Sequence, residues 1–419
     1  MRIAFVGLGA MGLPMARNLA KTDGIDLVLF DVDQRRLAEA ESFGQVAQSV
    51  AAAVADADYI FSVLPADVHV RTVGGQVREH GHAGQVYVDF STISPATIRR
   101  VADELAPQGI ETVGVALTRS TAAAQQGTLA LFLGGPQEHL TRLRPAFDAM
   151  ATDLLPTAGI EAAKAAKIVN NMVVAALDIL ACEAFVLGAR LGFTSRQVLD
   201  AMAAHGADSW VLTNHIERYV LPDDLGPGRF STRYMSKDVG LCGALARSAR
   251  QPAFFTGLAE SYYRGVRAHG HGDDYHMIVI RWLERGAAIG EPVTALASEG
   301  GEAGDLATLA TAASAVTTLV TLEALTLAAH HGLPVKLAAE YMERGSGGSD
   351  TMRAVLSGDH SGLTWRFSDL AGQVDAATEH AARLDVPATI FEVARHVALS
   401  LAVRFGPDAD VGTVLAELP

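Results

Sequence analysis

Residues 2–20 read RIAFVGLGAMGLPMARNLA, and this stretch decides the fold of the first part of the chain. An apolar run typical of a buried strand leads into the glycine pattern GLGAMG at 7–12, and a stretch typical of a helix follows. Asp31 ends the next β-rich run, 19 residues after Gly12. A strand, a glycine-rich turn, a helix and an acidic residue at this spacing predict a dinucleotide-binding βαβ unit.

The glycine turn would hold the pyrophosphate of the dinucleotide. Gly7 permits the tight turn, Gly9 lets the backbone approach the ligand, and Gly12 lets helix and strand pack closely. The phosphates would lie at the N-terminus of the helix, where free N–H groups and the helix dipole favour an anion. The expected cofactor contacts in this turn are Gly7, Gly9, Ala10, Met11 and Gly12.

Asp31 indicates which dinucleotide is bound. Its carboxylate can accept hydrogen bonds from the hydroxyls of the adenosine ribose and would repel a 2′-phosphate, so NAD is favoured over NADP. Arg35 and Arg36 follow closely. An arginine here can receive that phosphate, which leaves NADP open as an alternative.

Short apolar runs alternate with helical stretches over the first part of the chain, to about residue 160. This alternation predicts an α/β Rossmann fold with a doubly wound, mostly parallel sheet. Ligands lie beyond the carboxyl ends of the strands in such sheets. Leu64, Pro65 and Thr92, which follow two strand-like runs, are therefore further expected cofactor contacts. These loops could also be simple turns, with Thr92 as a cap.

The rest of the chain is rich in Ala, Leu and Val at helical spacing, and it repeats itself. CEAFVLGARLGF at 182–193 lines up with LEALTLAAHHGL at 322–333, an offset of 140 residues, and RFS recurs at 229–231 and 366–368, an offset of 137. Matches in a constant order favour an internal repeat over chance similarity between alanine-rich helices. The expected domains are a Rossmann domain at 1–163, an all-α domain at 164–288 and a second all-α domain, a degenerate repeat of the previous one, at 289–419.

Composition excludes several classes of protein. The 419 residues carry a formal net charge of −14, so nucleic acid is not an expected partner. Cys182 and Cys242 lie in apolar helical stretches and are expected to be buried free thiols of a cytoplasmic protein. No cysteine–histidine spacing is typical of a metal site, so no metal is expected. Asp178 and Glu183 interrupt the longest apolar run, which argues against a membrane span, and the chain opens on a strand without a leader.

Motifs in residues 1–288 resemble one known family. After the glycine turn come DFSTISP at 89–95, RSTAAAQQGTL at 119–129, KIVNN at 167–171, SKD at 236–238 and GHGDDY at 270–275. The series is similar to the β-hydroxyacid dehydrogenases, the group of 3-hydroxyisobutyrate dehydrogenase, with 6-phosphogluconate dehydrogenase as a larger relative. The resemblance implies hydride transfer between NAD and a small hydroxy acid or the corresponding aldehyde or ketone.

The resemblance also implies roles for residues of the helical part. Lys167 matches the family's catalytic lysine, which exchanges a proton with the substrate oxygen, and Asn171 matches the residue that orients the substrate. Their i, i+4 spacing places both on one helix face. Asn170 is an expected substrate contact. Lys237 matches a lysine near the cofactor, and the adjacent Asp238 is expected to hold structure.

The expected substrate loop departs from the family pattern. The family usually has DAPVSGG where this chain has GVALTRS at 114–120. Arg119 thus stands in place of a glycine, and its planar fork could bind an oxyanion. The run Arg119-Ser120-Thr121 is similar to the sulfolactaldehyde reductase branch, although that branch has a serine where this chain has Val174. Arg119 could instead lie at the surface or contact the cofactor. We expect a small substrate with a carboxylate, sulfonate or phosphonate, bound by Thr118, Arg119, Ser120, Thr121, Asn170 and Val174.

The second helical copy has lost the catalytic groups. The positions of the lysine and of both asparagines fall on Ala307, Ala310 and Thr311. We expect this copy to be structural and to form an internal pseudo-dimer of helical domains with the first copy, while a homodimer remains open as well.

Two other interpretations of the whole chain stay open. One is a non-catalytic NAD(H)-sensing or scaffold protein. The other is an imine reductase-like enzyme, although imine reductases lack the family lysine. With Lys167 present no histidine base is needed, so His205, His215 and His271 are expected to be surface or cap residues.

Overall fold

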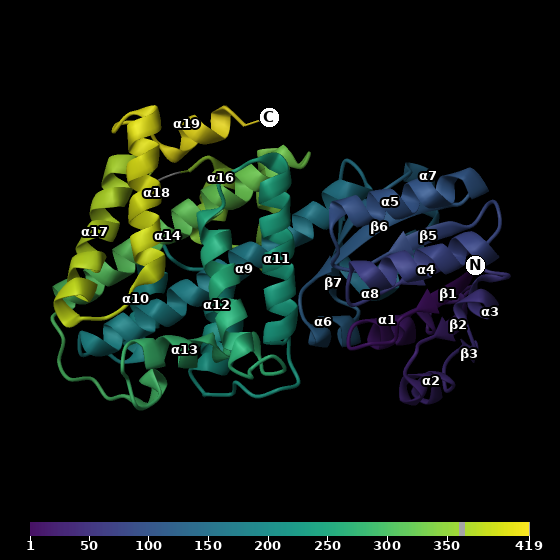
Figure 1. Ribbon diagram of the computed structural model, residues 1–419, viewed down its shortest axis with the longest axis horizontal. Helices are drawn as coiled ribbons and strands as arrows, with labels where there is room; N and C mark the ends of the chain where they lie inside the picture. Colours follow the sequence, from purple (N-terminus) through teal and green to yellow (C-terminus); the bar gives the residue numbers. More distant parts are fainter. Residues whose placement is uncertain (360–364, 419) are drawn as a thin grey trace. The chain divides into compact units, whose positions relative to one another are not determined.

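The computed structural model describes residues 1–359 and 365–418 (Figure 1). Contacts divide the chain into two compact units, which are Met1–Ile168 with His331–Leu333, and Val169–His330 with Pro334–Pro419. The boundary expected after residue 163 thus falls five residues later. The two expected helical domains share one unit, because helices of the second copy pack on helices of the first.

An eight-stranded sheet is the core of the first unit, with strand order β3-β2-β1-β4-β5-β6-β7-β8. Neighbouring strands are parallel, apart from the antiparallel pair β6 and β7. From β1 the chain adds β2 and β3 on one side and then returns to place β4 on the other side of β1. The strand order therefore reverses between β1 and β4, and ligands of doubly wound sheets bind at this switch point. The predicted Rossmann sheet is confirmed. Its strands are β1 (Arg2–Val6), β2 (Asp26–Phe30), β3 (Gln45–Val46), β4 (Tyr59–Ser62), β5 (Val86–Asp89), β6 (Glu111–Thr118), β7 (Leu129–Gly134) and β8 (Ala151–Pro156).

Both faces of this sheet are buried. Successive side chains of a strand point to opposite faces, so Phe5 and Phe61 lie in one apolar cluster while Ala4 and Ile60 lie in another. Burial on both faces explains why the strands are almost continuous apolar runs. The helices of this unit are α1 (Gly12–Leu19), α2 (Gln34–Ala40), α3 (Val50–Val54), α4 (Asp67–His80), α5 (Pro95–Leu105), the 3-10 turn η1 (Ala106–Gln108), α6 (Thr121–Gln126), α7 (Gln137–Arg142) and α8 (Arg144–Met150).

The second unit is helical, as expected. Its two longest helices are α9 (Ile160–Arg190), which begins in the first unit, and α14 (Ala303–His330). Both are long and apolar enough to cross a membrane, but 94% of the apolar window of each is buried, as in the core helices of a folded domain. The other elements are α10 (Ser195–Ala204), the π-helical η2 (Leu212–Val220), α11 (Thr232–Ala249), α12 (Phe254–Ala268), the 3-10 turns η3 (His276–Ile278) and η4 (Val293–Ala295), α13 (Val279–Gly286), α15 (Val335–Arg344), α16 (Asp350–Ser357), α17 (Phe367–Leu384), α18 (Thr389–Phe405) and α19 (Val411–Ala416).

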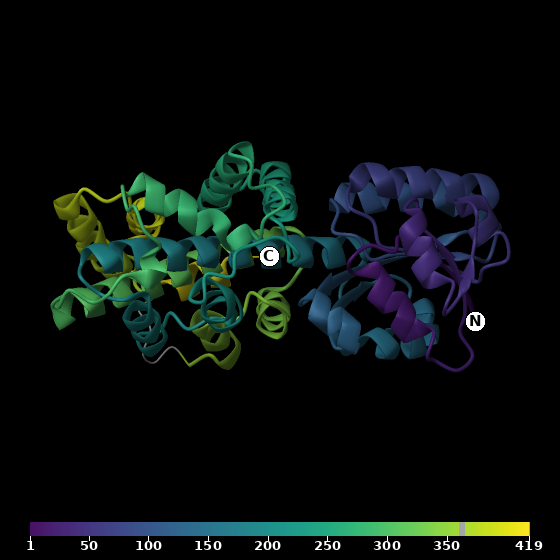
Figure 2. The same ribbon diagram turned by 90° about the horizontal axis from the view of Figure 1, so that it is seen from below.

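The second unit contains two series of elements in the same order. α10 and α15 begin at Ser195 and Val335, 140 residues apart, and α12 and α18 begin at Phe254 and Thr389, 135 residues apart. α11 packs beside α12, and α17 packs beside α18 (Figures 1 and 2). This order is the one that an internal repeat predicts.

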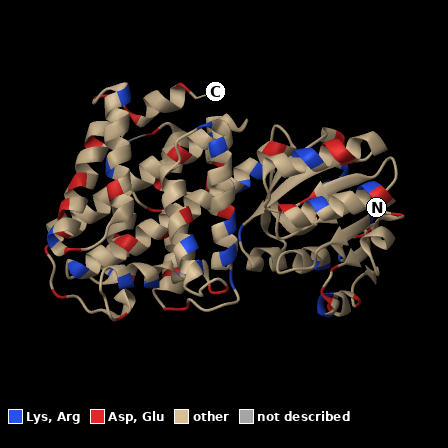
Figure 3. Ribbon diagram, viewed as in Figure 1, with Lys and Arg blue, Asp and Glu red and all other residues tan. Residues whose placement is uncertain are grey.

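Basic and acidic residues are interspersed along the helices of both units (Figure 3). Pairs four residues apart account for part of this mixing, such as Arg100 with Glu104 at 2.8 Å and Arg144 with Asp148 at 2.7 Å. At this spacing opposite charges stabilise an exposed helix by about 0.3 kcal/mol per pair.

Candidate functional site

The glycine turn between β1 and α1 fits a bound dinucleotide. Gly7 has a φ of +99°, and a Cβ there would lie 2.3 Å from the carbonyl oxygen of Val63. A Cβ on Gly12 would lie 1.9 Å from the carbonyl oxygen of Gly7, whereas a Cβ on Gly9 would meet nothing within 4 Å. A side chain at position 7 or 12 would therefore clash with the backbone, whereas Gly9 borders open space. Among the residues that the structure describes, no side chain caps the N-terminus of α1, which suits an anion at its amides.

Asp31, which follows β2, is held by the backbone. The amide of Leu8 donates to Oδ2 at 2.6 Å, and the amide of Asp33 donates to Oδ1 at 2.8 Å. Two donors fix the carboxylate and leave it lone pairs for the ribose hydroxyls. Nη2 of Arg35 donates to Asp33 Oδ2 at 2.9 Å. The arginine that could receive a 2′-phosphate is thus paired with a neighbouring carboxylate, although this exposed pair is weak.

The loops after β4 and β5 are bonded to each other. The amide of Leu64 donates to Ser91 Oγ at 2.8 Å, and Ser91 Oγ donates to Asp89 Oδ2 at 2.8 Å. Because β4 and β5 are parallel neighbours, Leu64, Pro65 and Thr92 lie at the same edge of the sheet. This is the edge at which the sequence predicts cofactor contacts.

A buried lysine that sequence reasoning missed is bonded to the same loops. Nζ of Lys164, in the first turns of α9, lies 2.7 Å from Asp89 Oδ1, and both side chains are 0% exposed. Nζ also donates to the backbone oxygens of Asp89, Ser91 and Val115 at 2.8, 2.9 and 2.7 Å. Every hydrogen of the ammonium group can therefore reach an acceptor, as a buried cation requires.

The second oxygen of Asp89 completes this buried network. Oδ2 accepts a hydrogen bond from Ser62 Oγ at 2.6 Å, and the Tyr87 hydroxyl lies 2.8 Å from the same Oγ. Burial, with the nearby Asp89 charge, raises the pKa of Tyr87 well above its usual value, so the phenol stays neutral. The network joins the carboxyl ends of β4 and β5 and the middle of β6 to α9, three residues before Lys167. A lysine in an apolar helical stretch indicates that a buried partner exists, but it does not identify Asp89, which lies 75 residues away.

The expected catalytic residues lie one turn apart on α9. The side chain of Lys167 is largely buried, as is that of Asn171. Nδ2 of Asn171 donates to Asp238 Oδ2 at 2.6 Å, and Nζ of Lys237 lies 2.9 Å from Asp238 Oδ1. Asp238, expected only to hold structure, therefore binds both Asn171 and Lys237.

Asn170 is bonded to a loop of the second helical copy. Its Oδ1 accepts from the amides of Ser346 and Gly347 at 3.2 and 3.0 Å, and its Nδ2 donates to Ser346 Oγ at 2.8 Å. A Cβ on Gly345 would lie 2.7 Å from Asn170 Oδ1, so glycine lets this loop come close. The expected substrate role of Asn170 competes with these bonds, which use most of the amide's capacity.

Arg119 has partners inside the first unit. Nη2 donates to Asp153 Oδ2 at 2.6 Å, and Nη1 donates to Thr152 Oγ1 at 2.9 Å and to the backbone oxygen of Thr128 at 2.7 Å. Its φ of +81° is rare for a residue with a side chain. Thr118 before it ends β6 and is buried. Within the same loop Ser120 Oγ caps α6, and Thr121 is the exposed first residue of that helix. Val174 is buried on α9.

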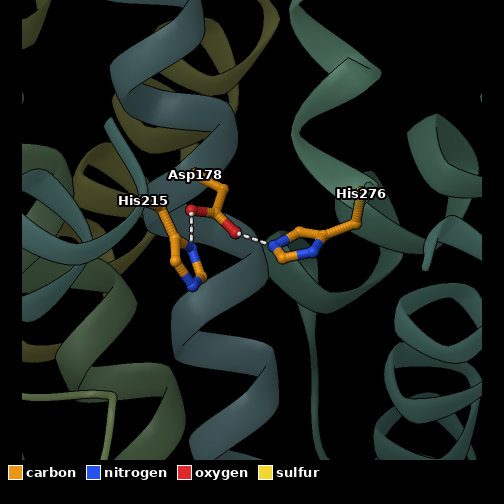
Figure 4. Close-up of side chains that lie close together, drawn as sticks. All are labelled: Asp178, His215 and His276. Atoms are coloured by element: carbon orange, nitrogen blue, oxygen red, sulfur yellow. Dashed lines mark hydrogen bonds and ion pairs between the residues drawn. The ribbon is translucent and has the colours of Figure 1, made fainter. Parts of the chain in front are cut away.

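Three side chains from separate segments meet in the second unit (Figure 4). Nδ1 of His215, on η2, lies 2.8 Å from Asp178 Oδ1, and Nε2 of His276, on η3, lies 2.9 Å from Asp178 Oδ2. Asp178 is on α9 and fully buried. The expectation that His215 is a surface or cap residue is wrong, because only 12% of its side chain is exposed and its ring is bonded to Asp178.

Other expectations about single residues agree with the structure. Nδ1 of His205 is bonded to the backbone oxygen of Ala201 at 2.8 Å, at the C-terminus of α10. His271 is bonded to Asp274 at 2.8 Å and is partly exposed. The free, buried state of Cys182 and Cys242 is confirmed.

Comparisons with known proteins agree with this geometry. A family model described as the NAD binding domain of 6-phosphogluconate dehydrogenase matches residues 2–171. A second, described as NAD-binding of NADP-dependent 3-hydroxyisobutyrate dehydrogenase, matches residues 162–283. The chain is 30% identical to 2-(hydroxymethyl)glutarate dehydrogenase of Eubacterium barkeri, over 72% of this chain and 98% of that protein. It is 31% identical to NAD-dependent L-serine dehydrogenase of Pseudomonas aeruginosa, over 65% and 94% of the two chains.

One solved structure matches nearly the whole chain. Plasmodium falciparum 6-phosphogluconate dehydrogenase is 11% identical, with a TM-score of 0.70 over 96% of this chain and 92% of that one, which shows a shared fold alone. Fold, glycine turn and relatives together define an oxidoreductase that acts on CH–OH groups with NAD as its cofactor. The chain belongs to the β-hydroxyacid dehydrogenase family.

Proposed function

We propose that the protein transfers a hydride between NAD and a small anionic hydroxy acid, or the corresponding aldehyde or ketone, with Lys167 as general acid and base. The observation that carries this proposal is the pair Lys167 and Asn171, one turn apart on α9, with Asn171 bonded to Asp238. NAD, when bound, accepts or supplies the hydride. Gly9, the α1 N-terminus and Asp31 would hold its pyrophosphate and ribose.

Lys167 would move the proton that accompanies hydride transfer. When hydride leaves the carbon of an alcohol, the proton of its hydroxyl must leave the oxygen, and an amine can accept it and return it in the reverse direction. Asn171 would orient the same oxygen. Its bond to Asp238 keeps the amide in one orientation, so each substrate molecule would meet the same polar group.

The loop Thr118–Thr121 would bind the anionic end of the substrate. Arg119 can contribute in two ways, by binding the anion itself or by holding the loop in shape through Asp153. We favour the second, because the guanidinium already donates to three oxygens of the first unit. Backbone amides and the hydroxyls of this loop would then meet the anion.

Lys167→Ala tests the proposed chemistry. General acid–base catalysis contributes about 10²–10⁴-fold, so turnover should fall by that factor in a cofactor-coupled screen of acidic alcohols and aldehydes, run in both directions with NAD and NADP. NAD affinity, measured by fluorescence titration, should be unchanged. Lys336→Ala, at an exposed position of α15, is the control. Unchanged turnover in Lys167→Ala would contradict the role of Lys167 as acid and base. Absence of turnover in the wild type would favour a sensor or scaffold, and turnover of imines alone would favour an imine reductase-like enzyme.

We also infer that the second helical copy takes the place of a partner subunit's helical domain. Ser209 and Ser349, equivalent positions at the offset of 140, pair as an antiparallel bridge. The amide of Trp210 donates to the oxygen of Gly348 at 2.9 Å, and the equivalent amide of Asp350 donates to the oxygen of Asp208 at 2.9 Å. Such reciprocal contacts between equivalent residues are those of an isologous dimer interface.

Two equivalent glutamates support the same inference. Oε2 of Glu183, in the first copy, accepts from the amide of Ile390 at 2.9 Å, at the start of α18 in the second copy. Oε2 of Glu323, in the second copy, accepts from the amide of Phe255 at 3.0 Å, at the start of α12 in the first. Each copy thus caps a helix of the other. A homodimer formed through other surfaces would appear as a doubled mass in light scattering.

A cytoplasmic location is part of the proposal. The buried free thiols Cys182 and Cys242 suit a reducing compartment. Cell fractionation tests this, and recovery of the protein with membranes would contradict it.

A further inference from the structure

We propose that Asp178, His215 and His276 form a binding site for a divalent transition-metal ion, with Zn²⁺ as the ion that suits the donor set (Figure 4). Each residue offers one ligand atom, and these three atoms lie within 4.8 Å of one another. The site lies wholly in the second unit and is separate from the proposed proton transfer at Lys167. It is a new site in addition to the NAD turn.

The hydrogen-bond geometry of His276 suits a cation at this point. Its Nδ1 lies 3.0 Å from the backbone oxygen of Phe230, which can only accept, so Nδ1 must carry a hydrogen. The neutral ring then directs the lone pair of Nε2 at Asp178 Oδ2, only 2.9 Å away. Two acceptors at this distance repel each other unless a proton lies between them or a metal ion binds both of them.

The bond from Nδ1 to a backbone oxygen also favours the metal. Metal-binding histidines usually donate their second ring N–H to a carbonyl or carboxylate, which fixes the tautomer and the ring orientation. His276 has this arrangement through Phe230. The ring of His215 packs edge-on against the rings of Trp210 and Tyr275, so its orientation is fixed as well.

Burial makes the negative charge of Asp178 costly without a cation. Asp178 and His276 are 0% and 1% exposed. A divalent ion would neutralise the carboxylate and take up the lone pairs of both imidazoles.

The donor set fits zinc among the common metals. Two imidazole nitrogens and one carboxylate are a set that zinc accepts, with bonds of about 2.0–2.2 Å and a further position open to water. Tetrahedral ligands on such bonds lie about 3.4 Å apart, so the N–O separations of 2.8 and 2.9 Å would widen by about 0.5 Å when the ion binds. His215 is the partly exposed ligand of the three, so the coordination position open to water would lie next to His215.

The experiment uses the full chain without NAD, so its outcome does not depend on turnover. The protein is dialysed against a chelator and titrated with Zn²⁺ in a calorimeter, and with Co²⁺ while the visible spectrum is recorded. We expect one equivalent to bind with a micromolar or lower Kd, with a Co²⁺ spectrum typical of nitrogen and oxygen ligands. His215→Gln and His276→Gln should each weaken binding by at least about 100-fold. His271→Gln, which removes a histidine paired with Asp274 nearby, should bind as the wild type does.

Three results would overturn the proposal. They are no stoichiometric binding in the wild type, equal binding in His276→Gln, or loss of binding in His271→Gln. The first would mean that the two imidazoles only form hydrogen bonds with Asp178. Far-UV circular dichroism checks that each variant is folded. If the glutamine variants do not fold, the Co²⁺ spectrum of the wild type decides, because it needs no substitution.

Discussion

Asp31 is the residue at which we expect the choice between NAD and NADP to be made. Its two backbone donors hold the carboxylate in place, and a ribose hydroxyl would add a charge-assisted hydrogen bond of about 1.5–3 kcal/mol. We therefore predict that Asp31→Ala raises the KM for NAD by about 10–100-fold and lowers the preference for NAD over NADP. Steady-state kinetics with both cofactors measure this. Asp33→Ala is the control, since it removes the partner of Arg35 and keeps Asp31. A wild type that already prefers NADP would contradict the assignment.

Arg119 and Asp153 offer a second test with single residues. If Arg119 holds the loop through Asp153, Arg119→Ala and Asp153→Asn should both raise the substrate KM, by about tenfold each, with kcat changed less. If Arg119 binds the substrate anion directly, Arg119→Ala should raise the KM, whereas Asp153→Asn should leave it equal or lower it by releasing the guanidinium. The ratio of the two KM values therefore decides which role is correct.

At the scale of the element, the buried pair of Lys164 and Asp89 anchors the start of α9. Removing one partner of a buried ion pair leaves an unpaired charge and costs about 3–5 kcal/mol, so Lys164→Met should strongly lower the free energy of unfolding. Urea titration followed by far-UV circular dichroism measures the loss. Arg99→Met removes the exposed pair with Glu161, in the first turn of the same helix, and should cost less than about 1 kcal/mol.

A double variant tests whether the pair acts as a unit. Lys164→Met combined with Asp89→Asn should cost less than the sum of the single changes, because neither charge is then left unpaired. Additive losses would show that Lys164 acts only through its three backbone acceptors.

Helices and strands could be predicted where the residues that define them lie close together in the sequence. The strand, glycine turn and helix of residues 2–20 follow one another within the spacing that the motif requires, so the βαβ unit was readable from the chain. Lys167 and Asn171 are one turn apart on a helix, and their common face follows from its period. The partners of these elements are distant in sequence, 75 residues for Lys164 and 67 for Asn171, and no period or motif reveals them.

At the scale of the whole molecule, the internal repeat could be predicted because its two proposed copies can be aligned with each other within one sequence. This alignment could not show which distant residues contact each other. Asp178, His215 and His276 meet because α9, η2 and η3 converge, although the residues are 37 and 98 positions apart. Asn170 contacts Ser346, 176 positions away, in the second copy, which lacks the expected catalytic residues. Packing within the first copy thus buries His215, which spacing alone placed at the surface, and packing between the copies gives Asn170 partners besides a substrate.

The same packing gives the molecule a pH dependence. Burial raises the pKa of Glu183, which caps α18, to about 7. Between its ordinary value near 4.5 and about 7, the folded state keeps a proton that the unfolded state has lost. The stability from this carboxyl is therefore complete below about pH 4.5 and is lost as the pH rises through 7, by an amount on the order of 3 kcal/mol.

Glu183→Gln should remove this dependence, because the amide cannot titrate and still accepts the hydrogen bond from Ile390. We predict that the Tm of the wild type falls relative to that of Glu183→Gln between pH 5 and pH 8. Burial also raises the pKa of Glu323, so Glu323→Gln should act in the same direction at the equivalent cap of α12. Glu392→Gln, at an exposed position of α18, is the control and should follow the wild type. Parallel curves for the wild type and both cap variants would show that these carboxylates stay ionised, and that the two copies are joined without a titrating contact.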